Sequence, residues 1–221
     1  MTDFVVHGIP GSPYVRAPLL ALEEKGLAWR LEPLAMGGQR TPEWRAYQPF
    51  GKIPAFEHDG MRFYETQAFL RYLDRVVPEP PLAPSDVRQL LRMDQLLNIV
   101  DCYVAPKVSG GLSFGRVVAP RLGLPSDEAA IVAAVPEATI VIDEIARLLG
   151  DQPYLAGDRV SLADLHLIAH LAFVPAYEEG RALLAPHANL SAWIARMIER
   201  PSFAATDWDV LLDRYPMPVA A

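Results

Sequence analysis

The chain has 221 residues, enough for one large domain or two modest ones, and 51% of them are hydrophobic, so it can bury a sizeable core. A formal net charge of −7 without any basic run argues against nucleic acid as a partner. No apolar run reaches the about 20 residues of a membrane span, no signal segment is visible, and the single cysteine, Cys102, excludes an internal disulfide and a cysteine-based zinc site. We therefore expect a cytoplasmic protein without a membrane partner.

The first third of the chain alternates between strand and helix signals. A short apolar strand over 4–7 is followed by Ser12-Pro13, which predicts a helix start because Ser is a good N-cap and Pro suits the first helical position. That helix should stop at Gly26. Trp29 and Leu31 alternate with charged residues, which indicates a second strand.

A polar stretch, two strands and a helix come next, and we expect them over 35–47, 53–57, 61–64 and 66–75. The polar stretch has room for one short helix beginning near Thr41. Asp59-Gly60 lies between the two strands and is a strong hairpin signal. The order β-α-β-(α)-β-β-α predicts a small mixed sheet covered by helices.

Four prolines within 77–86 mark a stiff linker and the predicted domain boundary. We expect a first domain over 1–77, a linker over 78–86 and an all-helical domain over 87–221. Strong helical periodicity covers 86–104, 136–149, 161–173 and 190–200. The segment 106–135 is weakly patterned, and a long loop with broken helical pieces is expected there.

Ser161 and Asp164 form a predicted capping box at the start of a nearly all-apolar helix. A helix that is apolar on every side belongs in the core of its domain. We therefore expect Asp164 to have a structural role, not a catalytic one.

Ile53-Pro54 opens one of the apolar strands, where a proline cannot donate a ladder hydrogen bond. An X-Pro bond can be cis. A cis bond would leave the N–H and C=O of Ile53 to hold a peptide ligand by its main chain. The alternative is a proline that only starts a strand.

Taken together, these pieces resemble the cytosolic glutathione transferases, as a serine-type, phi-, tau- or theta-like bacterial member. The matching motifs are Ser12, Phe50-Gly51-Lys52-Ile53-Pro54-Ala55-Phe56, Glu65-Thr66, the capping box after Gly157-Asp158, and Trp193 followed by Arg200-Pro201-Ser202. Each motif is short, but their order and spacing over nearly the whole chain are specific. The resemblance implies a thioredoxin-like N-terminal domain with a mixed four-stranded sheet (α/β) and an all-α helical bundle. It further implies a homodimer that uses glutathione as co-substrate, with no metal.

The resemblance also implies how glutathione is held. Ile53-Pro54 would be the cis-proline site that pairs with the cysteinyl backbone. Glu65 would take the ammonium group, and Thr66, at a helix N-terminus, would take the γ-glutamyl carboxylate through its N–H and hydroxyl.

The glycyl carboxylate of glutathione needs a cation, and Arg40 and Lys52 are the nearby candidates. The alternative for both is a solvated surface charge. Gln39 stands where phi-like members have a histidine, and it is a further candidate for this end of the ligand.

Ser12 is the candidate catalytic residue. The thiolate is the nucleophile, and a hydroxyl donor together with a helix N-terminus would lower the thiol pKa. The alternative is a plain N-cap. Tyr14 is the rival donor, but it comes one helical position too late, so we place it at the pocket wall.

The electrophile pocket is the least readable feature. We expect Tyr103, Phe114 and Tyr177 to line it with Tyr14, the alternative being that these aromatic residues belong to the core. In several classes of the resembled family, the aromatic at the position of Phe50 inserts between helices of the neighbouring subunit. We therefore expect Phe50 at the dimer interface, with packing inside its own subunit as the alternative.

The function predicted by this resemblance is transfer of the glutathione thiolate to small hydrophobic electrophiles. Two alternatives stay open. One is a glutathione-dependent isomerase or peroxidase on the same scaffold. The other is a non-catalytic binding module, against which the intact set of Ser12, Ile53 and Glu65 argues.

Overall fold

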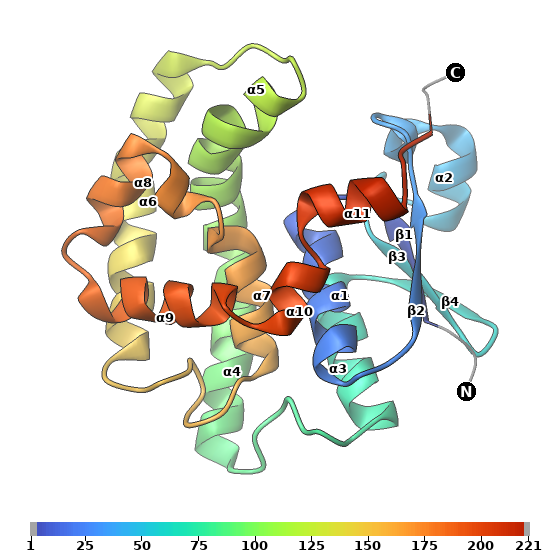
Figure 1. Ribbon diagram of the computed structural model, residues 1–221, viewed down its shortest axis with the longest axis horizontal. Coiled ribbons are helices and arrows are strands. Elements are labelled where there is room, and N and C mark those ends of the chain that lie inside the picture. Colours follow the sequence, from blue (N-terminus) through green and yellow to red (C-terminus); the bar gives the residue numbers. More distant parts are fainter. Residues whose placement is uncertain (1–3, 219–221) are drawn as a thin grey trace. The chain divides into compact units, whose positions relative to one another are not determined.

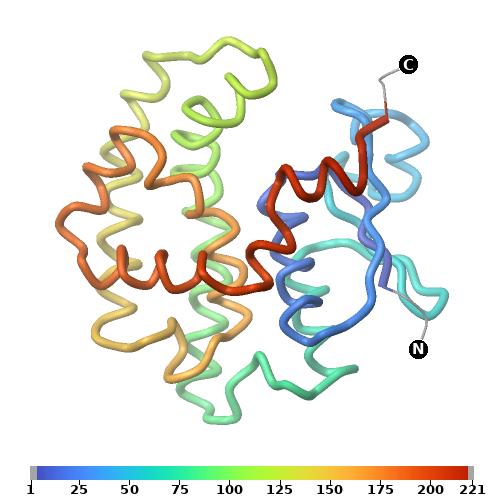
Figure 2. The backbone as a smooth tube through the Cα atoms, in the orientation of Figure 1, coloured from blue at the N-terminus to red at the C-terminus, as the bar shows by residue number. Residues whose placement is uncertain are grey.

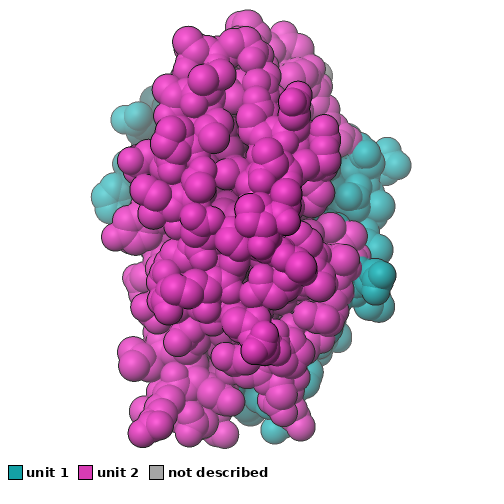
Figure 3. Space-filling view, turned by 90° about the vertical axis from the view of Figure 1, so that its left-hand side faces the viewer, with its two compact units in different colours: residues 1–83, 199–221 teal, residues 84–198 magenta. Residues whose placement is uncertain are grey.

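The structure is a computed structural model that describes residues 4–218. The chain forms two compact units, which Figure 3 distinguishes by colour. Unit 1 combines the N-terminal residues through Ala83 with the segment from Glu199 onward, and unit 2 spans Pro84–Ile198. Within residues 4–218, no helix combines the length and the apolar character needed to cross a bilayer.

Unit 1 is built on a four-stranded sheet with the strand order β2-β1-β3-β4. Its strands are β1 (Phe4–Gly8), β2 (Trp29–Pro33), β3 (Ala55–His58) and β4 (Met61–Tyr64). β1 pairs in parallel with β2 and antiparallel with β3, which pairs antiparallel with β4. The predicted thioredoxin-like mixed sheet is therefore confirmed. β3 begins two residues later than expected, because Pro54 has no N–H for the ladder.

The helices of unit 1's N-terminal part are α1 (Pro13–Glu24), η1 (Gly38–Arg40), α2 (Pro42–Tyr47) and α3 (Thr66–Val76). Figure 1 shows α1 and α3 lying side by side next to the sheet. The core between α3 and the sheet is aromatic: the Phe69 ring stacks on Phe56 at a centroid distance of 4.3 Å and meets Phe4 edge-on at 6.0 Å. All three side chains are at most 2% exposed, and burying each stabilises the fold by about 1.5–3 kcal/mol.

The proline-rich segment after α3 is bound to unit 1 by a buried lysine. Lys25 Nζ donates to the carbonyls of Val77 and Pro80, both at 2.7 Å, and pairs with Asp74 at 2.8 Å. Asp74 also accepts the N–H of Leu82. These backbone carbonyl and N–H groups of the segment therefore have partners inside unit 1.

The last two helices, α10 (Pro201–Ala205) and α11 (Trp208–Arg214), pack with unit 1. Unit 2 ends at Ile198, so the helical domain that was expected over 87–221 extends further toward the C-terminus than this unit. The reason is a long-range ion pair and hydrogen bonds: Arg200 and Ser202 both bind the Glu24 carboxylate at the end of α1.

Unit 2 is all-helical, as predicted. Its elements are α4 (Val87–Ile99), η2 (Val100–Val118), α5 (Ala119–Arg121), α6 (Glu128–Leu149), α7 (Leu162–Leu171), η3 (Val174–Ala176), α8 (Glu178–Leu184) and α9 (Ala188–Ile198). η2 is a π-helix that continues α4 without a break, which Figure 2 shows as one green run of the tube.

The prediction of a long loop over 106–135 is wrong for most of that segment. η2 runs through Pro106 to Val118, and α6 begins at Glu128. Two glycines of η2 serve helix packing: a Cβ on Gly111 would lie 3.0 Å from Ala134 Cβ, and one on Gly115 would lie 2.7 Å from Ile131 Cδ1. The missing side chains let η2 approach α6 closely.

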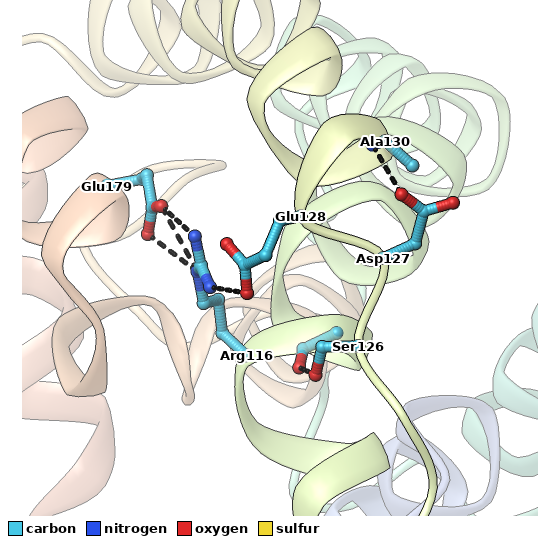
Figure 4. Close-up of polar contacts among 7 residues, drawn as sticks. Arg116, Ser126, Asp127, Glu128, Ala130 and Glu179 are labelled. Carbon is cyan, nitrogen blue, oxygen red and sulfur yellow. Dashed lines mark hydrogen bonds and ion pairs between the residues drawn. The ribbon is translucent and has the colours of Figure 1, made fainter.

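A charged cluster binds the end of η2 to its neighbours, as Figure 4 shows. Arg116 forms a bidentate contact with Glu179 of α8 and a 2.7 Å ion pair with Glu128 of α6. The Asp127 carboxylate caps α6 by accepting the N–H of Ala130. These contacts bind the last turn of η2 to α6 and α8 and cap the start of α6.

α7 is the central helix of unit 2, and each of its residues is buried. The predicted capping box is present, with the Asp164 carboxylate accepting the N–H of Ser161 at 2.8 Å. Asp164 also accepts from Leu155 N–H and Trp193 Nε1. Burial raises the pKa of Asp164, and these hydrogen bonds oppose the rise. Its contacts are those of a structural residue.

Candidate active site

Ser12 lies at the N-terminus of α1 with extended backbone angles (φ −69°, ψ 127°). Its carbonyl accepts from the N–H groups of Val15 and Arg16, so its main chain begins the helix. Its side chain makes no capping hydrogen bond, which contradicts the plain N-cap alternative. The hydroxyl and the first-turn N–H groups therefore stand together at a helix end that favours negative charge.

Tyr14 and Thr66 join the starts of α1 and α3. The Thr66 hydroxyl donates to the Tyr14 carbonyl at 3.0 Å. In a regular helix that carbonyl would accept from residue 18, which here is Pro18 and has no N–H. Thr66 is 4% exposed, and its hydroxyl proton is used inside the protein. In this structure the hydroxyl proton is engaged by the Tyr14 carbonyl, and the backbone N–H at the start of α3 is the other donor that Thr66 offers.

Glu65 precedes α3 with φ +78° and ψ 114°. A non-glycine residue at positive φ costs of order 1–3 kcal/mol and persists only where its surroundings impose it. The Glu65 carboxylate is thus exposed and does not cap α3.

The loop that carries Lys52 and Ile53 is held from inside through its main chain. Lys52 N–H donates to Gln48 Oε1 at 2.9 Å, and Trp44 Nε1 donates to the Lys52 carbonyl at 2.8 Å. The Lys52 side chain is exposed. The Ile53-Pro54 peptide bond is cis, as predicted. Sequence analysis missed Gln48 and Trp44, because no local pattern predicts which loop a buried polar side chain will bind.

Gln39 and Arg40 lie in η1, close to the same loop. A Cβ on Gly51 would come within 3.2 Å of the Gln39 carbonyl, so the two segments are in contact. The side-chain oxygen of Gln39 is buried, and no donor among the described residues reaches it. Arg40 is exposed. Unit 1 thus brings Gln39, Arg40 and Lys52 into one neighbourhood, as the glycyl end would require.

The aromatic candidates separate into two groups. Phe50 is 66% exposed and meets Tyr64 edge-on at 5.9 Å, so it is not packed inside its own unit. Tyr103 and Phe114 are exposed on η2. Tyr177 is 6% exposed, its hydroxyl is 3.0 Å from Ser113 Oγ, and burial raises its pKa to about 12. Tyr177 therefore lies in the core of unit 2, not on a substrate-facing surface.

Known proteins resemble this chain over most of its length. Residues 6–81 match the family model "Glutathione S-transferase, N-terminal domain", and residues 93–201 match "Glutathione S-transferase, C-terminal domain". Glutathione S-transferase F10 of Arabidopsis thaliana is 31% identical over 91% of this chain and 93% of its own length. A glutathione S-transferase of Hyoscyamus muticus is 28% identical over 90% of this chain and 95% of its own length. The crystal structure of poplar glutathione transferase F1 superposes with a TM-score of 0.81 at 28% identity. The superposition covers 93% of this chain and 97% of the poplar chain.

Proposed function

This chain belongs to the glutathione S-transferase family and is a glutathione transferase, and from that premise we propose how its residues act. Ser12 activates the thiol of glutathione, and the thiolate is transferred to a small hydrophobic electrophile. The observation that carries the proposal is the Ser12 hydroxyl, which stands at the start of α1 without capping it. The start of α3 is bound beside it through Thr66 and Tyr14.

The proposed binding mode uses main-chain and charged groups of unit 1. Ile53 pairs with the cysteinyl backbone, because the loop that carries it is held by Gln48 and Trp44. The Glu65 carboxylate binds the ammonium group, and the Thr66 N–H binds the γ-glutamyl carboxylate.

Gln39, Arg40 and Lys52 form the proposed site for the glycyl carboxylate. Both cations are exposed, and the segments that carry them are in contact at Gln39 and Gly51. The Gln39 amide can add a donor from the same neighbourhood. Charge-assisted hydrogen bonds of this kind are about twice as strong as neutral ones.

The proposed reaction needs one anionic nucleophile. The Ser12 hydroxyl donates a hydrogen bond to the sulfur, and the positive end of α1 favours the charged form, so the thiol loses its proton more readily. The thiolate electron pair then forms the C–S bond, and the leaving group departs with the electrons of the bond that breaks. Tyr14, Tyr103 and Phe114 are the proposed contacts of the electrophile.

The finer assignments complete the proposal. We infer a serine-type enzyme of the phi-, tau- or theta-like kind, because Ser12 is the N-cap residue of α1 and its hydroxyl does not cap the helix. We also infer that it acts in the cytoplasm. We also infer a homodimer with Phe50 at the interface. A ring that is 66% exposed on a loop is costly unless a partner covers it.

The proposal is tested by steady-state turnover of chlorodinitrobenzene with glutathione in Ser12→Ala and Tyr14→Phe. The expected result is a large loss of kcat in Ser12→Ala and little change in Tyr14→Phe. Loss in Tyr14→Phe alone would assign the donor role to tyrosine. A hydroperoxide measured beside the chloronitroaromatic separates transferase from peroxidase chemistry.

A further inference from the structure

The indole of Trp208 lies against the backbone immediately before Ser12. A Cβ built on Gly11 would fall within 2.5 Å of the indole Cδ2, and its three nearest atoms all belong to Trp208. Gly11 has φ +87°, a conformation that also favours glycine. Trp208 is 5% exposed. A residue from the last helix of the chain is therefore packed onto the loop that carries the proposed thiol-activating serine.

The segment just before Trp208 is held by a buried arginine in the first turns of α1. Arg16 Nη2 donates to the Phe203 carbonyl at 2.8 Å, and the guanidinium carbon lies 3.7 Å from the centre of the Phe203 ring. Arg16 Nε donates to Thr206 Oγ1 at 3.3 Å. The backbone N–H of Arg16 donates to the Ser12 carbonyl at 2.9 Å. One residue thus contacts both the Ser12 backbone and the segment leading to Trp208.

The charge at this contact is costly to bury and is compensated locally. Arg16 is 6% exposed, and burial lowers its pKa to about 10, with Asp207 opposing the shift. The guanidinium is therefore still protonated at neutral pH. Asp207, the residue before Trp208, is the negative charge that stabilises the Arg16 guanidinium.

The loop before Ser12 has few hydrogen bonds of its own. Ser12 N–H donates to the Ile9 carbonyl at 3.1 Å, and Pro10 has no N–H. The Ser12 hydroxyl makes no capping bond that would fix its direction. The direction of that hydroxyl therefore depends on where the backbone of Gly11 and Ser12 is held.

We propose that Trp208 is a positioning residue for Ser12: its indole holds the Gly11 backbone so that the Ser12 hydroxyl reaches the sulfur of glutathione. This inference rests on the proposed role of Ser12. Trp208 acts through Gly11 and does not touch the reacting atoms. Its loss therefore weakens the hydrogen bond to the thiolate, while the groups that bind the rest of glutathione stay in place.

The test measures the pKa of enzyme-bound glutathione, from the ultraviolet absorbance of the thiolate against pH, together with kcat and the glutathione KM. In Trp208→Ala the bound thiol pKa should rise and kcat at neutral pH should fall about ten-fold, because small misplacements of catalytic groups have effects of this size or larger. The loss of kcat should shrink as the pH is raised. The glutathione KM should change by less than about two-fold, since its binding groups are untouched.

Two further variants at the same position separate positioning from folding. Trp208→Phe keeps a ring against Gly11 and should stay near wild type. Trp208→Leu fills space without a planar ring and should show a raised thiol pKa, even if Trp208→Ala does not fold. Leu73→Ala, at a fully buried site in α3, is the control for a general loss of stability and should leave the thiol pKa unchanged.

The outcomes are distinguishable. A wild-type thiol pKa in folded Trp208→Leu, or an equal shift in Leu73→Ala, overturns the inference. Ser12→Ala measured in parallel tests the proposed function itself. If Ser12→Ala raises the thiol pKa and the Trp208 variants do not, only the positioning role fails; if Ser12→Ala has no effect, both fail.

Discussion

The Thr66 hydroxyl supplies a hydrogen bond to the Tyr14 carbonyl that Pro18 cannot supply. The two partners are 52 residues apart. The proline removes the i+4 donor from α1, and a side chain at the start of α3 replaces it. The same bond holds the starts of two helices together, and both are proposed to face glutathione.

Thr66→Val should therefore lower both stability and glutathione affinity. The valine keeps the shape but removes this donor from the part-buried Tyr14 carbonyl, which costs about 1–3 kcal/mol. Thr66→Ser is the matched control, because it keeps the hydroxyl. Urea unfolding and calorimetric titration with glutathione measure the two effects, and a Val variant equal to the Ser variant in both would show that the bond is dispensable.

Ser12→Ala should lower kcat much more than glutathione affinity. A hydrogen bond to a charged group contributes about 1.5–3 kcal/mol, so the rate near neutral pH should fall roughly ten- to a hundred-fold. Because the effect operates through the thiol pKa, the deficit should be smaller at alkaline pH. A pH-independent deficit would point to a role in binding or folding instead.

Glu65→Gln should raise the glutathione KM at least several-fold, because it removes the counter-charge of the ammonium. An analogue of glutathione without its amino group should bind the wild type more weakly than glutathione does. In Glu65→Gln this difference in affinity should disappear. Glu65→Gly provides a second test: glycine accepts φ +78° without strain, so stability should hold while affinity falls. Parallel losses of stability and affinity in Glu65→Gly would mean that the residue is only structural.

Glu24 should make the free energy of unfolding depend on pH in the acidic range. Burial raises its pKa, but hydrogen bonds from Arg200 and Ser202 outweigh burial, and the net pKa lies below 4.5. A lowered folded-state pKa stabilises the protein above the unfolded pKa, and that stability is lost as the pH falls through the folded value. Glu24→Gln should therefore flatten the decline of unfolding free energy below pH 4.5. Urea unfolding across that range measures it, and an unchanged slope would contradict the assignment.

Phe50→Ala should weaken the proposed dimer. The ring is 66% exposed in the single chain, and a buried aromatic anchor often dominates an interface. Sedimentation at micromolar concentration should show dissociation, with weaker glutathione binding because the same loop carries Lys52 and Ile53. A dimer as tight as wild type with normal affinity would remove Phe50 from the interface.

Much of the local structure follows from neighbouring residues alone. Ser12-Pro13 predicts the start of α1, Asp59-Gly60 predicts the hairpin, and Ser161 with Asp164 predicts the capping box. Each signal works because its hydrogen-bond partner or backbone preference lies within a few residues. The order of these signals along the chain is also enough to predict the fold family.

Other features depend on partners that are distant in sequence. The weak pattern of 106–135 suggested a loop, and only the approach of α6 shows that Gly111 and Gly115 serve helix packing. The Thr66 bond to Tyr14 and the contact of Trp208 with Gly11 also leave no local pattern. The tertiary structure decides them, because a contact between remote segments depends on how the whole chain folds, whereas caps and turns are specified by the backbone preferences of adjacent residues.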